Sequence, residues 1–377
     1  MSAPNGNPIR VCIVGAGLAG AATAFHLSEN EGYQITLMDK ERLPGVHSSG
    51  RNAAMIRQVV QPAAIAQVAQ DSRRFLEATA GPSADFRLDS HGSLLLGSNA
   101  CLEEIRTGLQ EQDALSDDVR MLGRRDLHLE FEPLVKSEYD SAIFTPSDGV
   151  VDVAGLLEYY IREARSRGVT LALSTTVIDI VRDGNRIDGV QTNAGYEPFD
   201  IVVNAAGPWT ARLGAMIGST TIPWRPFRRH LFFTGPLDWV DPSLPFIWDI
   251  ENHWYLRPES GGLLLCACDE TLVEPGIPDI DPSVTQLLTD KLSAHIPELD
   301  DLPIAKVWSG IRTFAPDRNF VIGWDLDVEG FFWVSGLGGH GVTCSWGVGA
   351  CAARVLTGKD DFGDRNFSPS RFWASAD

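Results

Sequence analysis

The stretch Val11-Cys-Ile-Val-Gly-Ala-Gly-Leu-Ala-Gly20 decides the fold of this 377-residue chain. Its four apolar residues predict a buried β-strand, and the Ala-rich run at residues 19–27 predicts a helix directly after it. Between the two, Gly15, Gly17 and Gly20 follow the G-x-G-x-x-G spacing. A strand, turn and helix of this kind present free backbone N–H groups and the positive end of the helix dipole to a pyrophosphate.

A second predicted strand, residues 33–38, ends at Asp39. The carboxylate of Asp39 follows the last glycine by about 20 residues, where an acid can hydrogen-bond a ribose diol. Because a carboxylate repels a 2′-phosphate, Asp39 favours an unphosphorylated ribose and argues against NADP. This unit predicts dinucleotide binding, and by itself it leaves NAD and FAD both open.

Composition and charge exclude several classes of function. The chain carries 31 basic and 50 acidic side chains, which give a net charge of −19. Its 377 residues, 44% of them hydrophobic, are enough to form the core of one large domain or of two domains. So acidic a protein repels nucleic acid and anionic membranes, and we expect neither as a partner. No apolar run reaches the ~18 residues of a membrane helix, and the first eight residues do not resemble a signal peptide. We therefore expect a cytoplasmic protein.

The six cysteines are scattered along the chain, and none has the spacing of a metal site, so no metal is predicted. Such cysteines are typical of a reducing compartment. Cys266 and Cys268 are close in sequence, and we expect them to point to opposite faces of a strand.

Two further segments have the chemistry of loops beside a flat ring system. Residues 43–57 combine Pro, Gly and small hydroxyl side chains, and Ser48 and Ser49 are candidates to bond phosphate or ribityl oxygens. An ordinary connecting loop is the alternative interpretation. Near the other end, Gly336-Leu-Gly-Gly-His-Gly341 opens an apolar helix at residues 342–356. That turn is a second helix N-terminus with partial positive charge.

The middle of the chain is mostly β. Strand-like runs at residues 224–234, 246–256 and 262–268 predict a second sheet over the first domain. Four basic residues lie on the first of these runs: Arg225, Arg228, Arg229 and His230. They form either a salt-bridged strand face or the local cationic pocket that an anionic substrate needs in so acidic a protein.

Taken in order, these stretches resemble the flavin amine-oxidoreductase superfamily of D-amino acid oxidase, glycine oxidase and monomeric sarcosine oxidase. The resemblance is carried by residues 15–39, the loop 48–56, Asn204-Ala-Ala-Gly-Pro-Trp209, and the paired runs 310–323 and 336–341. It implies FAD rather than NAD, because an NAD dehydrogenase has no reason to carry the C-terminal runs. The implied fold is α/β, with a Rossmann-like FAD-binding domain of the GR2 type and a second, mostly antiparallel β-sheet substrate domain.

The resemblance also implies a discontinuous domain organisation. The FAD-binding domain is expected to comprise residues 1–85, 145–220 and 307–377. The substrate-binding domain is expected to comprise residues 86–144 and 221–306.

Residue by residue, the resemblance implies which positions contact FAD. The expected cofactor-binding residues are Gly15, Ala16, Gly17, Leu18, Ala19, Gly20, Asp39, Lys40, Ser48, Ser49, Arg51, Asn52, Ala53, Ala54, Val177, Ala206, Gly207, Trp209, Gly338, Gly339, His340, Gly341, Val342 and Thr343. Monomeric sarcosine oxidase ties its flavin to a cysteine that Trp308-Ser-Gly-Ile-Arg-Thr lacks, so we expect non-covalent FAD. His47 leaves attachment through histidine open.

Four residues are expected to act on the substrate. Arg312 matches the arginine that glycine oxidase and D-amino acid oxidase place on the substrate carboxylate, which a guanidinium can bind with two hydrogen bonds. Arg57 matches a carboxylate-binding arginine of monomeric sarcosine oxidase, whose partner lysine is Thr343 here, so Arg57 and Arg312 are candidates for a mixed clamp. Tyr255 matches an aromatic hydroxyl near the substrate, and His340 is expected over the flavin edge. A structural arginine, a core aromatic and a backbone-bonded histidine are the alternatives.

The predicted function is FAD-dependent oxidation of the C–N bond of a small amino acid or N-substituted amino acid, of the D-amino acid, glycine or sarcosine type. Hydride passes to flavin N5, the imine product hydrolyses, and oxygen or another acceptor takes the electrons. Two alternatives stay open. One is an FAD-dependent 2-hydroxy acid dehydrogenase of the hydroxyglutarate type, which needs a base such as His340. The other is a flavin-binding protein without turnover.

Overall fold

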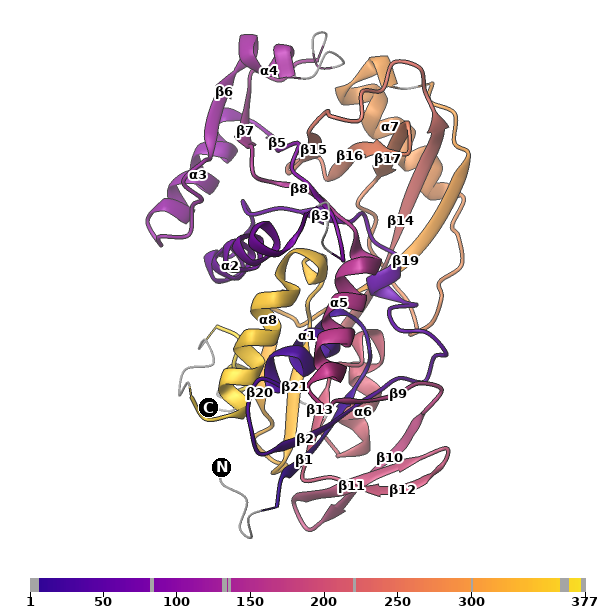
Figure 1. Cartoon of the computed structure of the whole chain (residues 1–377). Helices are drawn as coiled ribbons and strands as arrows, with labels where there is room; N and C mark the ends of the chain where they lie inside the picture. The colour runs from indigo at the N-terminus through magenta and orange to yellow at the C-terminus, as the bar shows by residue number, and fades with distance from the viewer. Residues whose placement is uncertain are drawn as a thin grey trace.

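Two sheets organise the chain (Figure 1). The structure, a computed structural model, describes residues 7–81, 85–130, 134, 137–219, 222–299, 301–359 and 366–373. In Figure 1 the first sheet lies in the lower half with both chain ends beside it, and the second sheet fills the upper half.

The first sheet has six strands in the order β20-β21-β13-β1-β2-β9. All neighbours are parallel except β20, which pairs antiparallel with β21. Its strands are β1 (Ile9–Val14), β2 (Tyr33–Met38), β9 (Thr170–Ala172), β13 (Ile201–Asn204), β20 (Val321–Trp324) and β21 (Phe331–Ser335). Helices cover a parallel sheet on both faces, which explains why β1, β13 and β21 are short, continuous apolar runs.

Helix α1 is the centre of the layer beside this sheet, and it packs on α8 and α5, while α8 also packs on α2 (Figure 1). The helices of this unit are α1 (Leu18–Leu27), α2 (Ala63–Thr79), α5 (Val153–Ser166), α6 (Thr210–Met216) and α8 (Gly341–Leu356). Small residues let α1 and α8 approach closely. A Cβ atom at Gly349 would lie 2.5 Å from the backbone carbonyl of Ala22.

The second sheet has the order β18-β14-β17-β16-β15-β5-β7-β6, with β19 beside β14. Neighbours are antiparallel except β15 and β5, which are parallel. Its strands are β5 (Ser93–Leu96), β6 (Arg120–Gly123), β7 (Ser141–Thr145), β14 (Arg225–Pro236), β15 (Phe246–Asp249), β16 (Trp254–Glu259), β17 (Gly262–Cys266), β18 (Thr271–Leu272) and β19 (Lys306–Phe314). Helix α7 (Ser283–His295) packs on it through Val284, Leu288 and Leu292.

Smaller elements complete the structure, and the β10–β12 sheet lies below the first sheet in Figure 1. Two three-stranded sheets are formed by β3 (Met55–Ile56), β8 (Gly149–Val151) and β4 (Leu88–Asp89), and by β10 (Val177–Asp183), β11 (Arg186–Thr192) and β12 (Gly195–Pro198). The remaining helices are α3 (Asn99–Gln110), α4 (Arg124–Glu130), η1 (Ser48–Gly50), η3 (Gly207–Trp209), η4 (Pro297–Leu299) and η5 (Pro369–Phe372). Among the helices of the described residues, none is both long and apolar enough to cross a bilayer.

The predicted fold class is confirmed: a Rossmann-like sheet is joined to a second, mostly antiparallel sheet. One predicted strand is wrong, because residues 246–256 form β15 and β16 with a turn between them, where His253 has a positive φ of 55°. The predicted domain limits stay a prediction. Strand β19 belongs to the second sheet, although its residues lie almost wholly in the segment 307–377 that was expected to bind FAD.

We expect Gly349→Ala to lower the free energy of unfolding by about 1–3 kcal/mol, because the new methyl group forces α1 and α8 apart. Gly108→Ala in α3 is the matched control. No atom lies within 4 Å of a Cβ there, so we expect this change to stabilise by up to about 1 kcal/mol. Denaturant unfolding measures both. Equal effects of the two substitutions would contradict close packing of α1 on α8.

Candidate functional site

A cavity of about 420 Å³ lies where residues 14–52 meet residues 311–342. Its wall combines the turn after β1, the loop 45–52, the turn after β13, and the glycine-rich turn before α8. The predicted cofactor residues in this wall are Gly15, Gly17, Leu18, Ala19, Asp39, Lys40, Ser48, Ser49, Arg51, Asn52, Val177, Ala206, Gly207, Trp209, Gly338, Gly339, Gly341 and Val342. Most predicted positions therefore surround one space.

One end of the cavity lies at the N-terminus of α1. This helix begins at Leu18, whose N–H donates to Ser49 Oγ at 3.0 Å. A Cβ atom at Gly17 would lie 3.0 Å from the same hydroxyl, so only glycine leaves this surface open. Asp39 is fixed at the end of β2, where Ala16 N–H donates to its Oδ2 at 2.8 Å. A pyrophosphate against the helix and a ribose against the carboxylate fit this arrangement.

The other end of the cavity is the turn that opens α8. Gly338 has a φ of 52°, and a Cβ atom there would lie 2.2 Å from the ring of Phe314. Arg312 lies directly beside this turn, because its Nε would be 3.8 Å from a Cβ atom at Gly339. The flat ring of a flavin against this glycine-lined turn would face the positive end of α8, with the Arg312 guanidinium beside it.

Six predicted cofactor residues do not line this cavity. Gly20 supports it from behind, since a Cβ atom there would lie 1.9 Å from the carbonyl oxygen of Gly15. The Thr343 hydroxyl donates to Met55 O at 3.1 Å and accepts from the backbone N–H of Arg57 at 3.3 Å. The others are Ala16, Ala53, Ala54 and His340. Their expected contacts with FAD stay predictions.

Of the four predicted catalytic residues, only Arg312 is in the wall of the cavity. Arg312 Nη2 donates a long hydrogen bond, 3.5 Å, to the Tyr255 hydroxyl. The Tyr255 ring stacks on Trp248 with 4.5 Å between ring centroids, and Arg57 Cζ lies 4.0 Å from the Trp248 ring. Trp248 is not among the residues predicted from the sequence. The signal for it is register, because Trp248 faces Tyr255 across β15 and β16.

Burial sets the protonation of these groups. Desolvation, and then the charges of Arg57, Arg312 and Arg229, lower the pKa of His340 to about 3, so the imidazole is neutral at physiological pH. Burial raises the pKa of Tyr255 well above its ordinary value, so the phenol keeps its proton and can donate it to an anion. Burial lowers the pKa of Arg57 only to about 10, and this guanidinium stays charged.

Asp148 is a buried acid close to Arg57. Its Oδ1 accepts from the backbone N–H of Gln58 at 3.1 Å and from Gln58 Nε2 at 2.9 Å, and its Oδ2 accepts from Ser93 Oγ at 2.7 Å. Burial nevertheless raises the pKa of Asp148 to about 6, because these bonds and the charge of Arg57 only partly offset desolvation.

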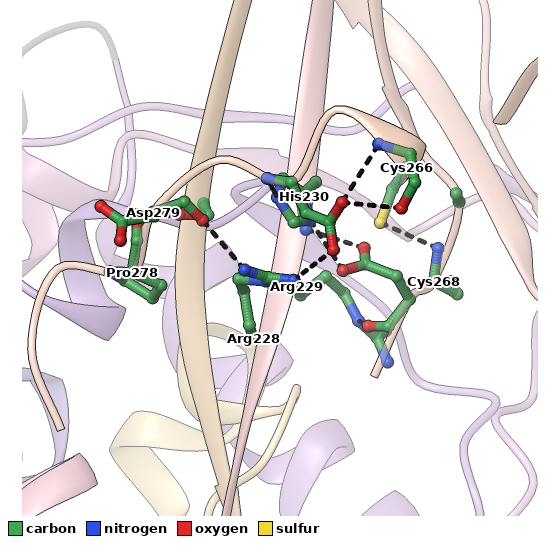
Figure 2. A network of polar contacts seen from close by, with 12 residues as sticks. Arg228, Arg229, His230, Cys266, Cys268, Pro278 and Asp279 are labelled. Atoms are coloured by element: carbon green, nitrogen blue, oxygen red, sulfur yellow. Dashed lines mark hydrogen bonds and ion pairs between the residues drawn. The ribbon is translucent and has the colours of Figure 1, made fainter. Parts of the chain in front are cut away.

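The basic cluster on β14 is largely a salt-bridged strand face (Figure 2). Arg228 Nη2 lies 2.7 Å from Asp281, and Arg229 Nη2 lies 2.7 Å from Glu270. The buried His230 shares a 2.7 Å hydrogen bond between Nδ1 and Asp269, and its Nε2 accepts from the backbone N–H of Asp281. These contacts hold the segment 269–281 against the sheet. Arg225 is exposed.

Figure 2 also shows Cys266 and Cys268 beside this network. The expectation that they point to opposite faces is wrong, because residues two apart on a strand point to the same face, and Cys268, beyond the end of β17 at Cys266, turns back with a φ of 51°. The backbone N–H of Cys268 donates to Cys266 Sγ at 3.3 Å. Although burial alone raises it, the pKa of Cys266 is lowered by hydrogen bonding with Cys268 and by the charges of Arg229 and Arg312.

Comparison with known proteins gives a consistent result. The family model described as FAD dependent oxidoreductase (DAO) matches residues 10–355. The chain is 25% identical over 380 residues to 4-methylaminobutanoate oxidase (formaldehyde-forming) of Paenarthrobacter nicotinovorans, covering 97% of this chain and 46% of that protein. It is 26% identical over 367 residues to glycine oxidase of Geobacillus kaustophilus, covering 93% of both. The chain thus spans about half the length of the first relative.

The fold is shared with solved structures. The crystal structure of L-proline dehydrogenase from P. horikoshii superposes with a TM-score of 0.87 at 23% identity, covering 97% of this chain and 98% of that one.

We expect Asp39→Ala to weaken FAD binding by about 10- to 100-fold, because charge-assisted hydrogen bonds contribute about 1.5–3 kcal/mol. Titration of apoprotein with FAD, followed by flavin fluorescence, measures the dissociation constant. Asp183→Ala, in the exposed turn between β10 and β11, is the control and should bind FAD as the wild type does. Unchanged affinity in Asp39→Ala would show that the carboxylate does not contact the cofactor.

Asp148 should leave a signature in the pH dependence of stability. Its folded-state pKa is raised to about 6 from its ordinary value of 3.8, so the unfolded state loses its proton first as pH rises. The stability contributed by the protonated carboxyl is therefore present below about pH 4 and is lost between about pH 4 and 6. The free energy of unfolding of the wild type minus that of Asp148→Asn should fall over this range by at most about 1.4 kcal/mol per pH unit. A flat or rising difference would contradict this.

Proposed function

Because the chain belongs to the FAD dependent oxidoreductase family, we propose that it oxidises the C–N bond of a small amino acid or N-substituted amino acid. The observation that carries the proposal is Arg312, a buried guanidinium in the cofactor cavity that has no carboxylate partner within 4.0 Å among the described residues. A buried cation without an anion next to it is costly unless a ligand supplies the anion. An amino acid brings that anion as its carboxylate.

Arg312 and Tyr255 together form a carboxylate-binding pair in this proposal. The Arg312 guanidinium offers two parallel N–H donors, and the Tyr255 hydroxyl, 3.5 Å from Nη2, offers a third donor. Both side chains are buried, so water competes little with a bound carboxylate for their hydrogen bonds, and the carboxylate keeps one orientation. Arg312 also lies beside Gly339, which places a substrate on this pair next to the turn that opens α8.

FAD, bound without a covalent link, supplies the acceptor for the hydride that leaves the substrate carbon. The protein then contributes position and electrostatics. Arg312 and Tyr255 orient the carbon, and the N-terminus of α8 provides partial positive charge where the reduced ring carries negative charge. The imine product hydrolyses in water. No side chain has to remove a proton if the amine reacts in its neutral form.

Oxidation of a 2-hydroxy acid is the weaker hypothesis. A hydroxyl group needs a general base, and a base works best when its pKa lies near the working pH. His340, with a pKa lowered to about 3, is poorly suited to that role. His230 is held between Asp269 and the backbone N–H of Asp281 and offers no free nitrogen.

We place the reaction in the cytoplasm, which the six free cysteines support.

We expect Arg312→Ala to raise the substrate concentration for half-maximal flavin reduction by about 10- to 100-fold and to lower the limiting rate, while FAD is retained. Anaerobic bleaching of the flavin absorbance measures both, with glycine, sarcosine, D-amino acids and N-alkyl amino acids as substrates.

Arg186→Ala provides the control, because this arginine is 57% exposed and lies in the β10–β12 sheet. Wild-type behaviour of Arg312→Ala would favour a flavoprotein without turnover or another substrate site. Loss of FAD would mean that Arg312 holds the cofactor instead.

A further inference from the structure

Arg57 is a second cation close to the cavity, half-buried as a whole, and the proposed binding pair does not use it. Its Nη1 is buried and has no hydrogen-bond partner. Among the described residues, no carboxylate lies within 4.0 Å of its guanidinium. Its position is nevertheless fixed, because its backbone N–H donates to Thr343 Oγ1 at 3.3 Å and its Cζ lies 4.0 Å from the Trp248 ring. A buried donor without a partner is destabilising, and because the side chain is held in place, a ligand that supplies an acceptor would relieve this cost.

Asp148 is the first acid that acts on Arg57 electrostatically, but it does not satisfy that donor. Its two oxygens already accept three hydrogen bonds, two from Gln58 and one from Ser93. Burial also raises the pKa of Asp148 to about 6, because desolvation destabilises the ionised carboxylate. Arg57 thus keeps a net attraction for an anion.

Arg57 and Arg312 lie at different ends of an aromatic pair. Arg57 Cζ is 4.0 Å from the Trp248 ring, and the Tyr255 ring is stacked at 4.5 Å from the same ring. Among the described residues, no hydrogen bond joins Arg57 to Tyr255 or to Arg312, so Arg57 contacts this pair through Trp248. Arg312 contacts the far member of the pair through the Tyr255 hydroxyl. The two guanidiniums thus contact different members of the aromatic pair, Arg57 beside Trp248 and Arg312 beside Tyr255.

We infer that the substrate carries two carboxylates, one held by Arg312 and Tyr255 and the other by Arg57. The class comprises acidic amino acids and amino acids whose nitrogen carries a carboxyalkyl group. The inference rests on the proposed function and narrows its substrate. It also explains why a chain with a net charge of −19 keeps two arginines without carboxylate partners in one site, since a dianion needs strong local attraction to enter so acidic a protein.

The test uses pairs of compounds that differ only in the second charge: glutamate and glutamine, aspartate and asparagine, and N-(carboxymethyl)glycine and its monoamide, with both enantiomers where they exist. Anaerobic flavin reduction gives the half-saturating concentration of each. In the wild type, the acid of the preferred pair should half-saturate at a concentration about 10- to 100-fold lower than its amide.

Three variants assign the second carboxylate. In Arg57→Gln the preference for acid over amide should fall to near 1, and Arg57→Lys should retain part of it. In Arg312→Gln both members of the pair should weaken by the same factor. Arg106→Gln, on the surface of α3, is the matched control and should keep the wild-type preference. Absorbance spectra and thermal unfolding report whether each variant holds FAD and folds.

A binding measurement without turnover provides a second readout. Glutarate should perturb the flavin absorbance of the wild type at about 10-fold lower concentration than butyrate, and this difference should disappear in Arg57→Gln. If Arg57→Gln fails to hold FAD, the inference is tested by the ratio of acid to amide half-saturating concentrations in the wild type and by the change of that ratio in Arg57→Lys.

Equal affinity for acids and amides in the wild type would overturn the inference and leave the proposed function intact. Equal weakening of acid and amide in Arg57→Gln would overturn it as well, because it would show both arginines on one carboxylate. If neither these compounds nor the neutral amino acids bleach the flavin, the proposed function fails and the inference fails with it.

Discussion

The close packing of α1 against α8 is the constraint on which the site depends. Each helix begins at a glycine-rich turn, and the two turns belong to opposite ends of the chain. They can face one cavity only if the helices lie side by side, which requires the absence of a side chain at Gly349, where a Cβ atom would meet Ala22. Gly20 does the same between α1 and the turn at Gly15. The glycines and alanines of these helices are therefore as important for function as the residues that touch a ligand, because they aim two helix dipoles at one place.

The pairing of β14 with β19 connects this cofactor cavity to the second sheet. Arg312 lies opposite Phe227 in that pairing, and the preceding residue, Ile311, accepts a 2.7 Å hydrogen bond from Ser48 Oγ in the loop beside the cavity. The same β14 strand is held on its other side by the ion pairs to the segment 269–281. Register and ion pairs together place the Arg312 guanidinium against the glycine-rich turn, so the second sheet determines the geometry of the substrate side.

The sequence predicts well those features that short segments determine. A strand, a glycine turn and a helix follow one another within residues 9–27, so spacing is enough to locate the phosphate end. The substrate side depends on pairings between distant residues. Trp248 matters because it faces Tyr255 across a turn that the apolar run 246–256 conceals. Whether the β14 arginines form a salt-bridged strand face or a cationic pocket likewise depends on Glu270 and Asp281, which lie some 40 to 50 positions away in the sequence and pair with them. No local pattern encodes these contacts.

Burial rather than charge explains how the proposed reaction proceeds without a base. Desolvation is the largest cause of the lowered pKa of His340, ahead of the charges of Arg57, Arg312 and Arg229. Carboxylates bound to the arginines would cancel much of the charge effect, but they would leave desolvation in place. A substrate ammonium in the same surroundings experiences the same penalty, which favours loss of its proton and gives the neutral amine. The second carboxylate therefore disturbs the mechanism little, because the arginines neutralise it while the dry environment still favours the neutral amine, whose ammonium form gives its proton to bulk water before it is enclosed.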